Sequence, residues 1–122
     1  MIKTQGLTHI HLVVRDLEKS LRFYESVFGM EEQFRDGPGM VFLNTPGSAD
    51  LVTLNENPDE VEKAGQNGGV AHFGFRLDES VSLDDAIEEV ELHGGKLVRR
   101  GEHAPGVLYA YVEDPDGYVI EL

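Results

Sequence analysis

The sequence contains no cysteine, which excludes a disulfide framework, a thiolate metal site and a cysteine nucleophile. It has no apolar run close to the roughly 18 residues that cross a bilayer. Residues 1–4 lack the apolar stretch and the cleavage site that begin a secreted protein. We therefore predict a cytoplasmic protein with no membrane-spanning segment.

Positive charge is also scarce. Lysine and arginine number 10 against 23 aspartates and glutamates, and the formal net charge is -13 at pH 7. Such a surface repels phosphate backbones and anionic lipids, so we expect neither nucleic acid nor a membrane as a partner. Apolar residues make up 40% of the 122 residues, which is enough for the core of one soluble domain.

An internal repeat organises the chain. Residues 7–30 and 70–98 each contain a β-rich run with a histidine, a turn at an aspartate and a helical stretch that ends in glycine. His9 and His72 occupy the same place in the two copies. We predict a single α+β domain, residues 1–122, built from two βαβββ modules at about residues 5–55 and 70–122. Polar residues 56–69 form the linker, with room for one helical turn. Each module curves into a half-barrel, and the two half-barrels pair into one metal-binding cleft.

Local signals mark the ends of the elements. Asp16 and Ser82 are predicted helix N-caps, because apolar residues follow each at helical spacing. Gly29 and the Gly94–Gly95 pair are predicted to end these helices. Short β-rich runs between turn residues indicate strands at residues 7–14, 31–35, 40–44, 49–54, 70–77, 96–100, 107–113 and 118–122.

Three of these strands carry candidate metal ligands. Successive strand residues point to opposite faces, so His9 and His11 share one face of the first strand. If the inward faces of the modules meet, His9, His72 and Glu121 converge from three strands. Two histidines and one carboxylate form a triad that binds divalent metals and leaves positions open for substrate. A single histidine on a strand is weak evidence, and the matched positions in the repeat are what favour a metal site.

Two segments carry a resemblance to a known superfamily. They read HIHLVVRDLEKSLRFYESVFGM near the start and YVEDPDGYVIEL at the end. Both resemble the vicinal-oxygen-chelate superfamily, which groups glyoxalases, bleomycin-resistance proteins, fosfomycin-modifying enzymes and extradiol dioxygenases. The resemblance covers essentially the whole chain. It implies metal ligation by His9, His72 and Glu121, a small-molecule substrate and commonly a homodimer, with the modules paired either within one chain or between two.

The leading functional prediction is an extradiol-type ring-cleaving dioxygenase. The run from Gly101 through His103 and Tyr111 to Glu121 resembles the signature of these enzymes. The resemblance implies Fe(II), a small catechol-like substrate, and catalytic roles for His103 and Tyr111. We place His103 in a loop flanked by glycine and proline, and take His11 as a further acid–base group lining the cavity. The chain departs from the signature at Ala110, where a larger apolar residue is usual. Many extradiol enzymes also carry a further histidine shortly before the second metal ligand, and residues 55–69 contain no histidine.

Two alternatives remain open. The first is a glyoxalase-like lyase or isomerase, or a thiol transferase, in which Mn, Ni or Zn acts as a Lewis acid. The glyoxalase pattern adds a glutamate ligand where Thr53 stands, and Glu56 is expected to lie beyond that strand. The second is a metal-free drug-binding protein of the bleomycin-resistance type, which the retention of all three ligands disfavours. A pocket for a thiol cosubstrate would draw on Arg22, Arg35, Arg76, Arg99 and Arg100.

Overall fold

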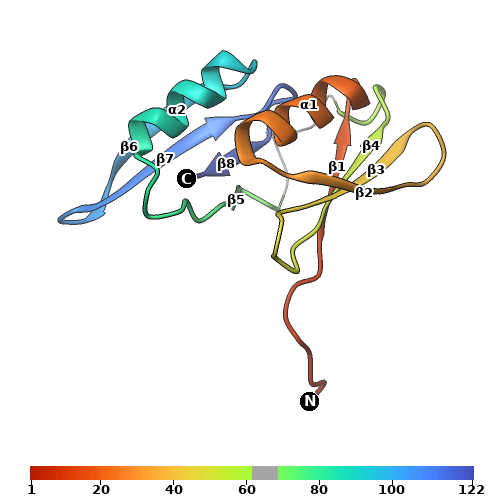
Figure 1. Ribbon diagram of the computed structural model, residues 1–122, viewed down its shortest axis with the longest axis horizontal. Helices are drawn as coiled ribbons and strands as arrows, with labels where there is room; N and C mark the ends of the chain where they lie inside the picture. The colour runs from red at the N-terminus through yellow and green to blue at the C-terminus, as the bar shows by residue number, and fades with distance from the viewer. Residues whose placement is uncertain (62–68) are drawn as a thin grey trace.

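The computed structural model describes residues 1–61 and 69–122, and in these residues two similar halves lie side by side (Figure 1). The first half contains β1 (Ile10–Val14), α1 (Leu17–Phe28), β2 (Glu31–Arg35), β3 (Met40–Asn44) and β4 (Val52–Glu56), with strand order β1-β4-β3-β2. The second contains β5 (Phe73–Gly74), α2 (Leu83–Leu92), β6 (Lys96–Ala104), β7 (Val107–Glu113) and β8 (Val119–Glu121), with order β5-β8-β7-β6. In each half the first strand pairs in parallel with the last, which confirms the predicted βαβββ repeat.

The helix ends follow the predicted local chemistry. The Asp16 side chain accepts a hydrogen bond from the backbone N–H of Lys19 at 2.9 Å, and Ser82 Oγ accepts from Asp85 at 3.0 Å. Gly29 ends α1 with φ of 62°, in the left-handed region that glycine adopts without strain. Neither helix in the described residues is long and apolar enough to cross a membrane.

Several strand boundaries differ from the predictions, among them those of β4 (Val52–Glu56) and β8 (Val119–Glu121), which were predicted at residues 49–54 and 118–122. The first strand begins at Ile10, and the predicted strand at residues 70–77 pairs only at Phe73–Gly74, because β8 offers it a short partner. In contrast, β6 pairs with β7 almost to its end and extends to Ala104. His103 therefore lies on a strand, and the predicted loop around it is wrong. The linker at residues 56–69, with its helical turn, falls partly outside the described residues.

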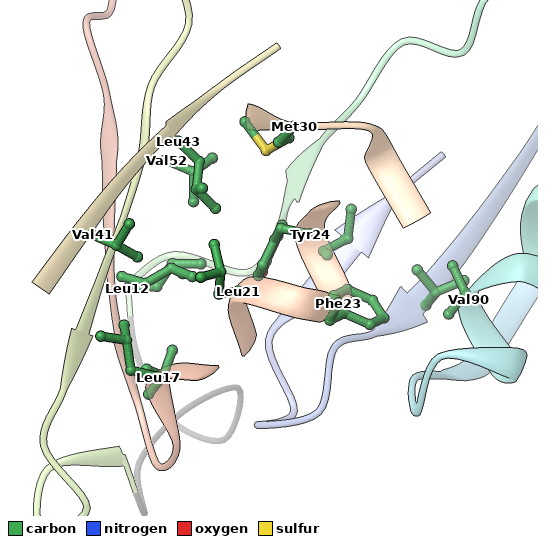
Figure 2. Close-up of a cluster of buried hydrophobic side chains, with 14 residues drawn as sticks. Leu12, Leu17, Leu21, Phe23, Tyr24, Met30, Val41, Leu43, Val52 and Val90 are labelled. Atoms are coloured by element: carbon green, nitrogen blue, oxygen red, sulfur yellow. The ribbon is translucent and has the colours of Figure 1, made fainter. Parts of the chain in front are cut away.

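The hydrophobic core lies between α1 and the first sheet and continues into the second half (Figure 2). Leu12 and Val14 of β1 are buried against the helix, whereas His11, which precedes Leu12, is exposed. Phe23 of α1 and Val90 of α2 lie near each other where the halves meet (Figure 2). Because one face of each sheet is covered by helix, the alternate residues of each strand are left on the open face.

A buried polar network also joins the two halves. Asp114, in the closing turn of the second half, is 3% exposed and accepts a 2.8 Å hydrogen bond from the hydroxyl of Tyr24 on α1. Its other oxygen accepts the backbone N–H groups of Asp116 and Tyr118. Asp116 in turn accepts a hydrogen bond from Ser20 on α1 at 3.0 Å. The closing turn is thus bound to the first helix, and the two halves are held beside each other.

Candidate metal and substrate site

The open face of the second sheet carries most of the predicted site residues. Ala110, Val112 and Ile120 are fully buried on the helix-covered face. Their neighbours Tyr111 and Glu121 therefore emerge on the opposite face. Tyr111 of β7 pairs with Glu121 of β8, which pairs in turn with Gly74 of β5, so these positions form one row across the sheet.

His72 and Glu121, two of the three predicted metal ligands, lie in direct contact. The Nε2 atom of His72 is 3.0 Å from Oε2 of Glu121. Gly74, two residues after His72, packs so closely on the next strand that a Cβ atom there would lie 3.1 Å from the backbone oxygen of Glu121. The missing side chain thus leaves room beside the carboxylate on this face.

His103 contacts the other oxygen of the Glu121 carboxylate. Its Nε2 atom lies 2.7 Å from Oε1 of Glu121, so one imidazole contacts each oxygen. The hydrogen bond with His103 is the main cause that lowers the pKa of Glu121; burial opposes it, and the charges of His103 and His72 lower the pKa further. The carboxylate is therefore ionised at neutral pH, which is the state that binds a metal.

An aromatic platform surrounds these residues. The Tyr111 ring lies 4.8 Å from the His72 ring and 5.2 Å from the Tyr109 ring, and Tyr109 stacks on His103 at 4.2 Å. The guanidinium carbon of Arg99 lies 4.9 Å from the centre of the Tyr111 ring. Tyr109 was missed by the sequence analysis, although its two-residue spacing from Tyr111 in a predicted strand places both on one face.

The first half holds the remaining candidates, His9 and His11. His9 is exposed, and its Nδ1 atom lies 3.0 Å from the hydroxyl of Thr8. It lines a largely apolar cleft of about 790 Å³ between the N-terminal end of β1 and the β5–α2 region. Among residues 1–61 and 69–122, no three His, Asp or Glu side chains are arranged to hold one metal ion. A single chain therefore brings His72, His103, Tyr111 and Glu121 together and leaves His9 and His11 apart from them.

The glyoxalase pattern has a fourth ligand, a glutamate, at the position that Thr53 occupies in this chain. Thr53 pairs in register with His11, is 1% exposed, and its hydroxyl has no hydrogen-bond partner in the described part of the chain. Glu56 was expected beyond the strand but is the last residue of β4. Its Oε2 atom accepts the backbone N–H of Leu17 at 2.8 Å, at the positive end of the α1 dipole. Glu56 thus caps a helix.

The donor set suits a divalent metal. Imidazole nitrogens and a carboxylate oxygen bind Zn, Mn, Ni and Fe(II), and the His72–Glu121 pair offers one of each within 3.0 Å. A metal ion held by three protein groups needs one ligand besides His72 and Glu121. His9 is the candidate, because it occupies in the first copy of the repeat the position that His72 occupies in the second.

The fold and this residue set define a family. The sequence matches the Glyoxalase/Bleomycin resistance protein/Dioxygenase superfamily over residues 6–122, and the chain belongs to it. It is 37% identical over 126 residues to a lactoylglutathione lyase of Neisseria meningitidis, covering 95% of this chain and 88% of that protein. It is 33% identical over 119 residues to a catechol-2,3-dioxygenase of Bacillus subtilis, covering 94% of this chain but 41% of that protein.

Solved structures share the architecture. A glyoxalase-related enzyme from Fulvimarina pelagi is 28% identical, with a TM-score of 0.71 over 97% of this chain and 86% of that one. A mutant fosfomycin resistance protein from Listeria monocytogenes, complexed with Mn(II) and 1S,2S-dihydroxypropylphosphonic acid, has a TM-score of 0.78 at 23% identity. That match covers 98% of this chain and 90% of the other, and it establishes the fold.

Proposed function

We propose that this protein is a divalent-metal-dependent lyase or isomerase that acts on a small substrate with two neighbouring oxygen atoms. The observation that carries the proposal is the Glu121 carboxylate, held between His72 and His103 on an open sheet face. The lactoylglutathione lyase of Neisseria meningitidis matches over 88% of its own length, against 41% for the catechol dioxygenase. This difference in coverage favours the lyase or isomerase over the extradiol dioxygenase, which was the leading prediction from the sequence.

We assign His72 and Glu121 of one chain, together with His9 of a second chain, as the metal ligands. A metal bound there would supply Lewis-acid chemistry, by polarising a substrate oxygen. The mixed nitrogen and oxygen donors suit Mn, Ni, Zn or Fe(II). With Thr53 at the fourth position and Glu56 capping α1, the ligand set contains three protein groups.

The way the two halves are held supports a site whose ligands come from two chains. The buried Tyr24–Asp114 contact and the packing of Phe23 near Val90 fix the halves side by side. His9 does not meet the His72–Glu121 pair in that arrangement. A two-fold symmetric homodimer would bring the first half of each chain to the second half of the other, and would form two identical sites.

The remaining residues of the site would act on the ligands and the substrate. His103 hydrogen-bonds Oε1 of Glu121 and so fixes the orientation of the carboxylate, as partners of metal ligands commonly do. The Tyr111 hydroxyl is a hydrogen-bond donor for a substrate oxygen on the same face. His11 would contribute an acid–base group from the first half of the partner chain.

A mixing experiment tests the shared site. His9→Ala and Glu121→Ala each remove a ligand from both sites of a homodimer, and neither variant should retain metal. After dissociation and joint reassembly, a mixed dimer has one intact site if the ligands come from two chains. Random pairing then restores about a quarter of the wild-type metal content.

The matched control combines His72→Ala with Glu121→Ala. These residues lie on the same half, so their mixed dimer has no intact site and should remain metal-free. Failure of the His9→Ala and Glu121→Ala mixture to recover metal would contradict the shared site. Wild-type protein that takes up no metal after reconstitution would contradict the enzyme proposal and favour the metal-free drug-binding alternative.

A second candidate, the extradiol dioxygenase, is favoured by one specific observation. His103 contacts Glu121 and Tyr111 lies against His72, which is the grouping that the dioxygenase signature implies. Elemental analysis of protein purified anaerobically without chelator separates the two candidates. About one iron per chain with turnover of catechols would favour the dioxygenase. Manganese, nickel or zinc with turnover of a thiol adduct of an α-ketoaldehyde would favour the lyase or isomerase.

A further inference from the structure

We infer that Arg99 recognises an anionic group on the substrate, at a distance from the end that binds the metal. Arg99 of β6 pairs in register with Tyr111 of β7, and Tyr111 pairs with Glu121 of β8. The three side chains therefore share the open face and lie in one row across three strands. The inference rests on the proposed function for the position of the reacting end, and it concerns a different part of the substrate.

The guanidinium is held by the aromatic platform. Its carbon lies 4.9 Å from the centre of the Tyr111 ring and 6.0 Å from that of Tyr109. A guanidinium that rests on an aromatic ring keeps its N–H donors directed outward from its edge. The Tyr111 ring lies in turn 4.8 Å from the His72 ring. Two such steps, of 4.9 and 4.8 Å, link Arg99 to a proposed metal ligand.

The charge of Arg99 is not used within the described part of the chain. Arg15, Arg35 and Arg100 each have a carboxylate partner, at 3.6, 2.8 and 2.6 Å respectively. Arg99 has no carboxylate within 4.0 Å among the described residues. In a chain with a net charge of -13, a cation left unpaired on the site face offers local attraction for an anion.

The geometry of arginine narrows the kind of ligand. Its forked donors match the two oxygens of a carboxylate or phosphonate, and such charge-assisted pairs are stronger than hydrogen bonds between neutral groups. We therefore assign the substrate to small molecules that carry two neighbouring oxygens at one end and a carboxylate or phosphonate at the other.

Anion binding to metal-free protein tests the inference without any turnover. Acetate and methylphosphonate are titrated at constant ionic strength with chelator present, and the ring signals of Tyr109 and Tyr111 are followed by NMR. We expect saturable shifts with at least one anion, and the tighter one identifies the class. Arg99→Gln should weaken binding about tenfold or more, because a charged hydrogen-bond donor is lost. Arg99→Lys should give an intermediate loss, since it keeps the charge without the fork.

Arg100→Gln is the matched control. Arg100 adjoins Arg99, carries the same charge, and points to the α2 side, where it pairs with Asp84. It should bind both anions as the wild type does. The inference is overturned if neither anion saturates the wild type, if Arg99→Gln binds unchanged, or if Arg100→Gln loses as much affinity.

Metal content separates this inference from the proposed function. Arg99→Gln should retain the wild-type metal content, because Arg99 is not a ligand. Anion binding that depends on Arg99 in a protein unable to hold metal would support the inference and refute the proposed function. A wild-type protein that binds metal but has no anion site dependent on Arg99 would refute the inference and leave the proposed function standing.

Discussion

The hydroxyl of Tyr24 donates a 2.8 Å hydrogen bond to Asp114, and this buried contact joins the first helix to the closing turn of the second half. Burial is the main cause that raises the pKa of Tyr24, and the neighbouring charge of Asp114 raises it further. The phenol therefore remains a donor at neutral pH. Burial also raises the pKa of Asp114 to about 6, although hydrogen bonds from Tyr24, Tyr118 and Asp116 oppose the increase.

Asp114 should make stability depend on pH. Its pKa in the folded protein lies above the ordinary value of 3.8, so its contribution is greatest below about pH 4 and is lost as the pH rises to about 6. Asp114→Asn removes this titration. The unfolding free energy of Asp114→Asn, measured relative to that of wild type, should increase by roughly 2 kcal/mol between pH 4 and pH 7. Urea denaturation at a series of pH values measures the difference, and the exposed Asp59→Asn variant is the control. A difference that does not vary with pH would contradict the assignment.

Glu56 should matter for stability and not for metal binding. Its carboxylate accepts the backbone N–H of Leu17 at the start of α1, so Glu56→Ala should lower the unfolding free energy by about 1 kcal/mol. The Glu25→Ala variant removes an exposed carboxylate from α1, near the opposite end of the helix from Leu17, and should have a smaller effect. Denaturant melts and elemental analysis are the measurements. Loss of metal in Glu56→Ala would make Glu56 a ligand and refute its capping role.

Thr53 should tolerate an apolar replacement. Its buried hydroxyl has no partner among the described residues, and valine has nearly the same shape. Thr53→Val should therefore leave the unfolding free energy unchanged or raise it by about 1 kcal/mol, with metal content unaltered. A Thr45→Val variant provides the contrast, because the Thr45 hydroxyl bonds to Asp50 at 2.8 Å and its loss should destabilise. A clear loss of metal in Thr53→Val would show that the hydroxyl serves the site.

His103 should affect turnover more than metal content. It contacts Glu121 but is not an assigned ligand, so His103→Ala should retain metal while kcat falls roughly a hundredfold. His93→Ala is the comparison, since His93 bonds to the backbone oxygen of Glu89 at the end of α2. Metal analysis alongside steady-state kinetics distinguishes the two roles. Full activity in His103→Ala would remove this residue from the mechanism.

Sequence alone predicted the local features because their causes are local. Asp16 and Ser82 cap helices with hydrogen bonds to residues three positions later, and Gly29 supplies a backbone conformation that few other residues adopt. The turn at residues 114–117 formed as predicted, with the Gly117 N–H donating to the Asp114 oxygen. The repeated histidines predicted one candidate metal ligand in each module, His9 and His72, and this assignment stays a prediction.

The tertiary structure decided which candidates meet. Glu121 reaches His72 and His103 only because β8 lies beside β5 on one side and β7 on the other, an order set by pairing between distant segments. The same folding places the Glu56 carboxylate at the N-terminus of α1 and leaves the Thr53 hydroxyl without a hydrogen-bond partner among the described residues. Within those residues it also keeps His9 out of any metal-binding group with the other proposed ligands. Sequence determined which chemical groups the protein carries and how each short segment folds, since both depend on near neighbours. The packing of the two halves decided which groups face one another, since that depends on contacts between residues far apart in the chain.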